Sequence, residues 1–278
     1  MRTSKRPPER LEANDVTEFL KHVQQIRVRK GWFKKNDPWE PWFRGQQRAA
    51  WPLKPKLYRN RTFAQVKAQN VEDEIREEFI KRAPIMCETL PVGSESLVKW
   101  QWYFMMQHFG AATRLVDWTE GALIGLYFAV RNSPGEYDAA VWVLDPYQLN
   151  EYVIGKPWVI APGATGVVKK HSAMVAPWLP ESFIKMRGLP SQPVAVNPTH
   201  VAQRISSQHS CFTIHGKDEM ALESLRGELN RCVVKIVIPR SGAQTIKKEL
   251  RTCGITETTI FPELDGLGRS INAMWEIG

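Results

Sequence analysis

Hydrophobic positions follow a helical period in three places before residue 111. Over residues 14–30 the apolar side chains fall on one stripe, and Gly31 follows the stripe. A second pattern covers residues 62–88, with apolar residues on one side and a run of acids from 72 to 78 that we expect to face solvent. A third pattern ends at Gly110, because glycine favours the left-handed conformation that terminates helices. The pattern therefore predicts three amphipathic helices in this part of the chain.

The next stretch combines a short polar segment with an apolar helix. We expect residues 113–117 to be extended and residues 120–131 to form a helix that is apolar almost all round, and therefore buried. Thr119 is a good N-cap for this helix, and Glu120 would lie in the first turn, where the helix dipole favours an acid.

The remaining hydrophobic runs predict strands near residues 42, 141, 212, 235 and 259. Between 147 and 203 the periodicity is weak and prolines interrupt it repeatedly. We interpret this part as a long irregular insert, either a surface excursion or a segment that faces a substrate. The fold class is α+β, with a basic N-terminal helical segment (1–35) followed by one domain (36–278).

Composition limits the class of protein but indicates no particular chemistry. A chain of 278 residues suits one large domain or two small ones. Neither a signal peptide nor a membrane span is visible, and the four cysteines are scattered without Cys-x-x-Cys spacing. We therefore expect a cytoplasmic protein with reduced thiols, no membrane association and no metal site.

Positive charge is concentrated at one end of the chain. Residues 1–61 hold sixteen Lys or Arg and six Asp or Glu, a net charge of +10 against +9 for the whole chain. The same segment carries Trp32, Trp39, Trp42 and Trp51. Cations interleaved with aromatic rings suit a nucleic acid through phosphate attraction and base stacking. The alternatives are a solvated basic face with buried tryptophans, or an acidic protein partner.

Candidate chemistry gathers around residues 108–119. His108, Arg114, Asp117 and Thr119 lie just before the buried helix, whose N-terminus is a ready site for phosphate. The structural alternative is that Arg114 and Asp117 pair with each other. His108, His209 and His215 are possible acid–base groups, and Cys211 is a conceivable nucleophile, although its place in a strand favours a buried thiol.

A second candidate is Arg44, which stands between bulky apolar residues and Gly45 in a predicted strand. Arginine holds phosphates and carboxylates through two parallel hydrogen bonds, so Arg44 is either a ligand clamp or one half of a structural ion pair. The common phosphate-loop, dinucleotide, zinc-protease and serine-hydrolase motifs do not occur.

Four ordered motifs resemble the FRG domain family, which is named for a Phe-Arg-Gly tripeptide. The tripeptide is Phe43-Arg44-Gly45, and the central signature is Gln107-His108-Phe109-Gly110 followed by Thr113-Arg114-Leu115-Val116-Asp117-Trp118-Thr119. Two later pieces also match: Gln208 with Phe212-Thr213-Ile214-His215, and Phe261-Pro262-Glu263-Leu264-Asp265-Gly266-Leu267.

The order of these motifs is also similar to that of the ADP-ribosyltransferase superfamily. That resemblance implies a mixed or antiparallel sheet core with flanking helices, and NAD as a substrate. Arg44, with Gly45 and Arg114, would bind the cofactor phosphates, and Asp117, Trp118 and Thr119 would shape the nicotinamide pocket. The resemblance implies Gln208 in the third, catalytic position, with Glu263 as the competing candidate. His108, from its acid–base chemistry, is a further candidate catalytic residue.

Three functions stay open at this stage. The first is an NAD-dependent ADP-ribosyltransferase that modifies nucleic acid, with RNA favoured. Such an activity implies a bacterial toxin of a toxin–antitoxin or antiviral defence module, with an inhibitory antitoxin-type partner. The second is a non-catalytic nucleotide or nucleic-acid binding module. The third is a nuclease that uses His108 and His209.

Overall fold

A single sheet runs through the computed structural model, which describes residues 10–29, 40–59, 65–87, 89–132, 135–163, 169–179, 190–198, 210–225 and 227–275. The strand order is β1-β7-β4-β2-β3-β6-β5. All neighbours are antiparallel except β1 and β7, which run parallel. Its strands are β1 (Arg10–Glu12), β2 (Trp42–Gln46), β3 (Leu115–Thr119), β4 (Ala139–Leu144), β5 (Val194–Val196), β6 (Ser210–Ile214) and β7 (Val233–Ile238).

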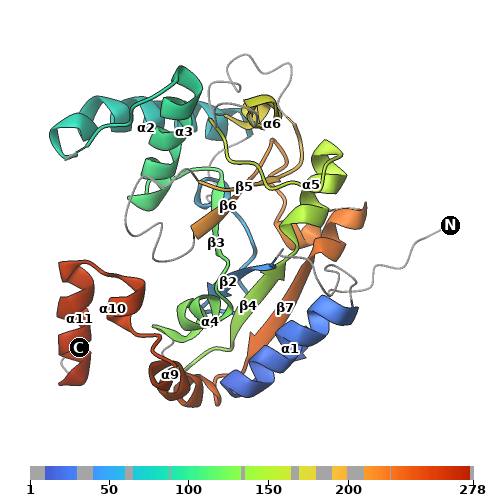
Figure 1. Cartoon of the computed structure of the whole chain (residues 1–278), viewed down its shortest axis with the longest axis vertical. Coiled ribbons are helices and arrows are strands. Elements are labelled where there is room, and N and C mark those ends of the chain that lie inside the picture. The colour runs from blue at the N-terminus through green and yellow to red at the C-terminus, as the bar shows by residue number, and fades with distance from the viewer. Residues whose placement is uncertain are drawn as a thin grey trace.

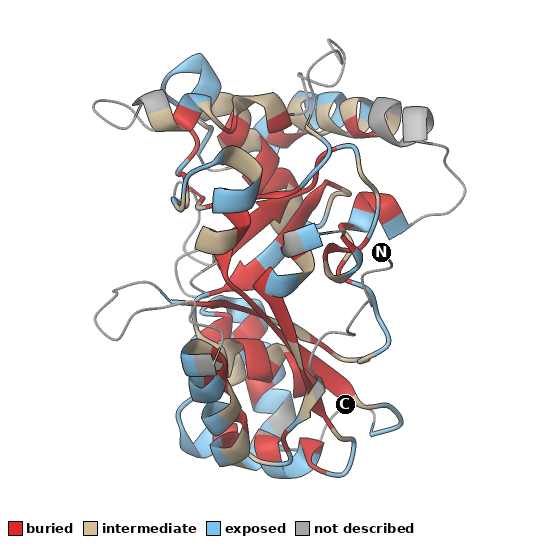
Figure 2. Cartoon of the chain, turned by 90° about the vertical axis from the view of Figure 1, so that its right-hand side faces the viewer, coloured by how far each residue is buried: buried red, intermediate tan, exposed pale blue. Residues whose placement is uncertain are grey.

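Helices cover both faces of this sheet (Figure 1). They are α1 (Val16–Arg29), α2 (Gln65–Arg82), α3 (Glu95–His108), α4 (Ala122–Val130), α5 (Pro146–Ile154), α6 (Lys169–Ala173), α9 (Ala243–Thr252), α10 (Glu257–Ile260) and α11 (Leu264–Met274). Buried residues concentrate in the strands and on the inner sides of the helices (Figure 2). The mixed α+β class expected from the sequence is confirmed.

Two cores lie on opposite faces of β2, because side chains alternate along a strand. Phe43 packs with α1, α4 and α9 in one core. Trp42 packs with Trp142 and Leu149 in the other. A third core joins α3 to β5 and β6 through residues such as Trp100, Phe104 and Phe212.

The sheet is divided between β2 and β3. These strands pair only at Phe43 and Thr119, whereas β2 pairs with β4 over five residues and β3 pairs with β6 over five. The β1-β7-β4-β2 half and the β3-β6-β5 half therefore meet at one point and diverge from it. In Figure 1, β3, β6 and β5 lie above β2, β4 and β7.

Several sequence predictions need correction. The chain enters the sheet at β1, a strand of three residues that the hydrophobic pattern did not indicate. The expected strand near 259 is the helix α10, because Thr256 caps it in a capping box with Thr259. The insert 147–203 is less irregular than expected, since it contributes most of α5, all of α6 and the edge strand β5.

Two corrections concern side chains near the polar segment. Helix α4 begins at Ala122 with Gly121 as its N-cap, so Thr119 is not the cap; its hydroxyl instead accepts a hydrogen bond from Gly121 N at 3.1 Å. Glu72, expected to face solvent, is 1% exposed. None of the helices among the described residues is long and apolar enough to cross a membrane.

Candidate functional site

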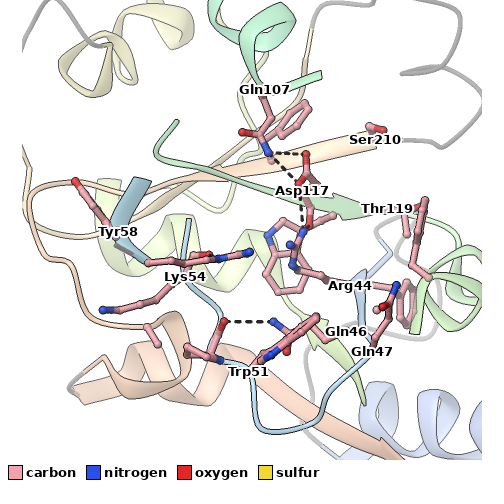
Figure 3. A pocket seen from close by; sticks show the side chains of 18 of the residues that line it. Arg44, Gln46, Gln47, Trp51, Lys54, Tyr58, Gln107, Asp117, Thr119 and Ser210 are labelled. Atoms are coloured by element: carbon pink, nitrogen blue, oxygen red, sulfur yellow. Dashed lines mark hydrogen bonds and ion pairs between the residues drawn. The ribbon is translucent and has the colours of Figure 1, made fainter. Parts of the chain in front are cut away.

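A pocket of about 1040 Å³ opens where β2 and β3 diverge (Figure 3). Its walls come from β2, β3, β6, the C-terminal end of α3, helix α4 and the loop after β2. The lining residues are Phe43, Arg44, Gly45, Gln46, Gln47, Trp51, Pro52, Lys54, Tyr58, Arg59, Gln107, His108, Asp117, Trp118, Thr119, Phe128, Ser210, Phe212, Met220, Ala221 and Ser224.

Arg44 lies at the centre of this pocket (Figure 3). Its Nη1 donates to the backbone carbonyl of Asp117 at 2.6 Å and to Asp117 Oδ2 at 3.3 Å. Its Nε is buried and has no hydrogen-bond partner in the described part of the chain. Asp117 therefore fixes one edge of the guanidinium, and the side chain as a whole is 18% exposed to the pocket.

A short hydrogen-bond chain holds Asp117 in turn. Gln107 Nε2 donates to both carboxylate oxygens of Asp117 at 2.9 Å. Thr113 Oγ1 donates to Gln107 Oε1, which orients the amide. These contacts connect α3 and the loop after it to β3 and, through Arg44, to β2. Gln107 and Thr113 position Arg44 without contacting it.

Gly45 is required by packing rather than by a ligand. A Cβ at residue 45 would lie 2.2 Å from the carbonyl oxygen of Gly125 and 2.3 Å from the backbone nitrogen of Ala129. On the same face, a Cβ at Gly125 would lie 2.6 Å from Phe43 Cβ. The two glycines let α4 pack directly on β2, and this close packing places the helix behind Arg44.

Positive charge dominates the pocket. Arg44, Lys54 and Arg59 line it, and among the described lining residues Asp117 is the only acid. Burial and the repulsion of Arg44 lower the pKa of Arg59, and Asp117 opposes this shift. Cations crowded together in this way are stabilised by a bound anion.

Aromatic rings form the other walls. Phe43, Trp118, Phe128 and Phe212 contribute to the lining. Trp118 is 3% exposed, and its indole nitrogen donates to Thr213 Oγ1 at 3.0 Å, so it is a fixed wall. The pocket thus combines apolar walls with a few cations, as ligand sites do.

Arg114 lies outside this pocket. Its guanidinium is fully buried, and donates to Glu72 Oε2 at 2.7 Å, to the His215 carbonyl at 2.6 Å and to the Trp178 carbonyl at 2.5 Å. This network disagrees both with a phosphate-binding Arg114 and with an Arg114–Asp117 pair. Arg114 joins α2, β3 and the segment after β6.

The other predicted residues divide into three groups. His108, Asp117, Trp118 and Thr119 line the pocket together with Arg44 and Gly45. Glu263 does not: it is exposed and stands at the N-terminus of α11. Gln208 and His209 lie outside the described residues, and Ser210, which follows them, lines the pocket from β6.

Two other candidate side chains are unsuited to chemistry. Burial raises the pKa of the Cys211 thiol well above its usual value, which disfavours the thiolate. Burial, Arg114 and Lys54 lower the pKa of His215 to about 3, so its ring is neutral. Within the described ranges no group of three His, Cys, Asp or Glu side chains is arranged to hold a metal ion.

Sequence reasoning missed Gln107, Lys54, Tyr58 and Arg59 as pocket residues. Gln107 stood inside the recognised motif and is one helical position from His108, so the motif itself was the available signal. Lys54 follows β2 in a loop, and Tyr58 and Arg59 belong to the short 3-10 helix Lys56–Arg59, so only the fold brings these three residues to the pocket.

Residues 40–137 match the model of the FRG domain family. The resemblance stated for the Phe-Arg-Gly tripeptide and the central signature is confirmed, because both lie inside this range. No curated protein and no solved structure matches the chain.

Proposed function

We propose that this protein is an ADP-ribosyltransferase that takes NAD as its substrate in the pocket between β2 and β3. One observation carries the proposal. The pocket is lined by Arg44 from β2, by the segment from Asp117 to Thr119 from β3, and by Ser210 from β6. These three strands are adjacent in the sheet, and Ser210 lies two residues after Gln208. Two motif positions that are far apart in sequence thus share one site, and β6 begins at the same pocket.

The pocket suits a dinucleotide in size and charge. Its volume of about 1040 Å³ lies at the upper end of ordinary ligand sites. The three cations Arg44, Lys54 and Arg59 match a pyrophosphate, since charge-assisted hydrogen bonds to phosphate are among the strong ones. The aromatic walls suit the flat nicotinamide and adenine rings.

In the proposed reaction the bond between ribose C1′ and the nicotinamide nitrogen breaks. Nicotinamide leaves as a neutral molecule with the electron pair of that bond, and the ribose becomes oxocarbenium-like. An oxygen or nitrogen of the acceptor then bonds to C1′ and loses its proton. The protein contributes by clamping the phosphates and by excluding water from the reacting bond. Gln208 stays the candidate for the third position. Glu263 is disfavoured, because it lies at the N-terminus of α11 and does not line the pocket.

The experiment follows release of nicotinamide and transfer of label from NAD, with cellular RNA, DNA and protein offered separately. Arg44→Ala should lower both by about 10²-fold or more, because it removes a donor aimed at charge in the site. Arg251→Ala, an exposed arginine on α9, is the matched control and should leave both unchanged. A folded Arg44→Ala variant with full activity would contradict the site assignment.

A second candidate function is a nucleotide-binding module without catalysis. It is favoured by one observation: among the described lining residues only Asp117 is an acid, and it is held by Gln107 and Arg44. The same assay separates the two functions, since the module would bind NAD or ADP-ribose in calorimetry and release no nicotinamide. A nuclease that uses His108 would instead cleave nucleic acid without NAD.

The role as a toxin with an inhibitory partner depends on the transferase activity. We expect that expression of the wild-type chain arrests bacterial growth and that Arg44→Ala does not.

A further inference from the structure

The loop after β2 carries an exposed ring beside the mouth of the pocket. Trp51 is 44% exposed and lines the pocket. The guanidinium of Arg48 lies 5.8 Å from the Trp51 ring centroid and 4.2 Å from that of Tyr137, which is also 44% exposed. We call Arg48, Trp51 and Tyr137 the rim cluster.

This loop is fixed to the rest of the fold. Ala49 N donates to the Asp138 carbonyl at 2.7 Å, and Lys235 Nζ donates to the Ala49 carbonyl. Trp51 N donates to the Arg48 carbonyl at 3.0 Å, which closes a turn. The backbone that carries Arg48 and Trp51 is therefore held in place, and a ligand that binds there loses less free energy to ordering the loop.

The segment that carries Arg48 and Trp51 is strongly basic, whereas Glu136 and Asp138 flank Tyr137. Residues 40–59 contain five cations (Arg44, Arg48, Lys54, Lys56 and Arg59) and one acid, Glu40. Glu40 is paired with Arg27 at 3.0 Å. On the opposite side, Glu223 accepts a hydrogen bond from Leu53 N at 3.2 Å and so contributes to holding the loop. The basic side chains lead from the surface into the pocket.

We propose that the rim cluster and the cations beside it bind single-stranded nucleic acid as the acceptor of the transferase. A base stacks on Trp51, and the phosphates on either side contact Arg48 and Lys54. Because Trp51 belongs both to the surface and to the pocket lining, a nucleotide stacked there lies next to the proposed NAD site. Stacking on an aromatic ring accepts any base, and it requires a strand whose bases are unpaired. The acceptor role, but not the binding, rests on the proposed function.

The test measures fluorescence anisotropy of a short labelled single-stranded RNA, the DNA of the same sequence and the RNA duplex, all without NAD. Trp51→Ala should weaken binding of the single strands roughly 5- to 100-fold. Trp275→Ala, at an exposed tryptophan that follows α11 and does not line the pocket, should not weaken it. Arg48→Gln should reduce the slope of log K against log salt by about 0.7, and Arg251→Gln should leave the slope unchanged.

The outcomes separate this surface from the catalytic proposal. Loss of RNA binding in Trp51→Ala supports the surface, whether or not the wild-type protein releases nicotinamide. If it releases none, the transferase proposal fails while the binding surface stands. Equal RNA binding by Trp51→Ala and Trp275→Ala would overturn the surface even if NAD is consumed. Tighter binding of polyglutamate than of RNA would overturn it in favour of an acidic protein partner.

Discussion

Consecutive residues of β2 have different tasks because they point to opposite faces of the sheet. Phe43 and Gly45 face α4, where one fills the core and the other leaves room for the helix backbone. Arg44 points to the opposite face and lies at the centre of the pocket, which Phe43 and Gly45 border from the α4 side. In the Phe-Arg-Gly tripeptide, the first and third residues make packing contacts, and the arginine between them is the functional side chain.

We predict that Gly45→Ala destabilises the fold. The added Cβ would overlap backbone atoms of Gly125 and Ala129, which cannot move without shifting α4. Overpacking of this kind costs about 1–3 kcal/mol or more. Urea denaturation measures the loss. Gly268→Ala is the control: nothing lies within 4 Å of its Cβ on the exposed face of α11, so it should add about 0.5–1 kcal/mol. Equal stability of the two variants would contradict the packing role of Gly45.

At the level of elements, one buried ion pair joins α2 to Arg114, the residue that precedes β3. Arg114 and Glu72 are 0% and 1% exposed and lie 2.7 Å apart. Burial opposes the charge on Arg114, but Glu72 and its neighbours outweigh that effect, so the pKa of Arg114 is raised above its usual value. Tyr103 on α3 donates to the same carboxylate, so three elements share one charged centre.

Breaking this pair should destabilise the protein rather than change its chemistry. We expect Arg114→Met to lower the free energy of unfolding by about 3–5 kcal/mol, because Glu72 would remain buried and unpaired. The double variant Arg114→Met/Glu72→Leu should recover part of the loss. Chemical denaturation of the three proteins gives the values. A stable Arg114→Met variant that has lost nicotinamide release would restore Arg114 to the candidate site.

The N-terminus of α5 gives a pH dependence. Asp145 is 1% exposed and accepts hydrogen bonds from Tyr147 N and Gln148 N, and burial raises its pKa from 3.8 to about 6. The folded state therefore holds the proton more tightly than the unfolded state, and this group lowers stability as pH rises from about 4 to 6. Asp145→Asn keeps the cap but does not titrate. Its stability relative to wild type should rise by up to about 3 kcal/mol between pH 4 and pH 7 in urea titrations. A constant difference would show that Asp145 does not titrate in this range.

Elements with a local signal were predicted well from the sequence. Helices α1, α3 and α4 and strands β2, β4 and β7 were expected near their observed places, because periodicity and end signals lie within each segment. Strand β1 has only three residues, and α10 carries β-branched residues that suggested a strand. The capping pair of Thr256 and Thr259 was present in the sequence as the correcting signal.

The site was predictable only where its residues are close in sequence or lie in the motif. Arg114 was paired with nearby Asp117, but its partner Glu72 is 42 residues away. Likewise, nothing local indicates that β2 and β3 pair at a single position, and that divergence creates the pocket. Such long-range relations depend on the whole sheet, which no single segment encodes.

On the scale of the whole molecule, the range that matches the FRG family is not a closed structural unit. Residues 40–137 include β2, α2, α3, β3 and α4 but lack β4, β6 and β7. In the complete sheet β4 pairs with β2 and β6 pairs with β3, so both strands of the pocket would lose a neighbour in this fragment.

We therefore expect a fragment of residues 40–137 to have no cooperative unfolding transition and no affinity for NAD. Circular dichroism during thermal melting and calorimetry with NAD measure the two properties, and the complete chain is the reference. A fragment that melts cooperatively would show that the half of the sheet outside this range is dispensable.

The position of β7 has a consequence for biosynthesis. This strand comes from residues 233–238, yet it lies between β1, near the start of the chain, and β4. While residues 1–232 are being synthesised, the nascent chain already contains Arg44 and Asp117 but lacks β7, which completes the sheet that supports them. The pocket can mature only after most of the chain has been translated. Any harmful activity would be withheld from ribosomes and transcripts until synthesis of the protein is nearly finished.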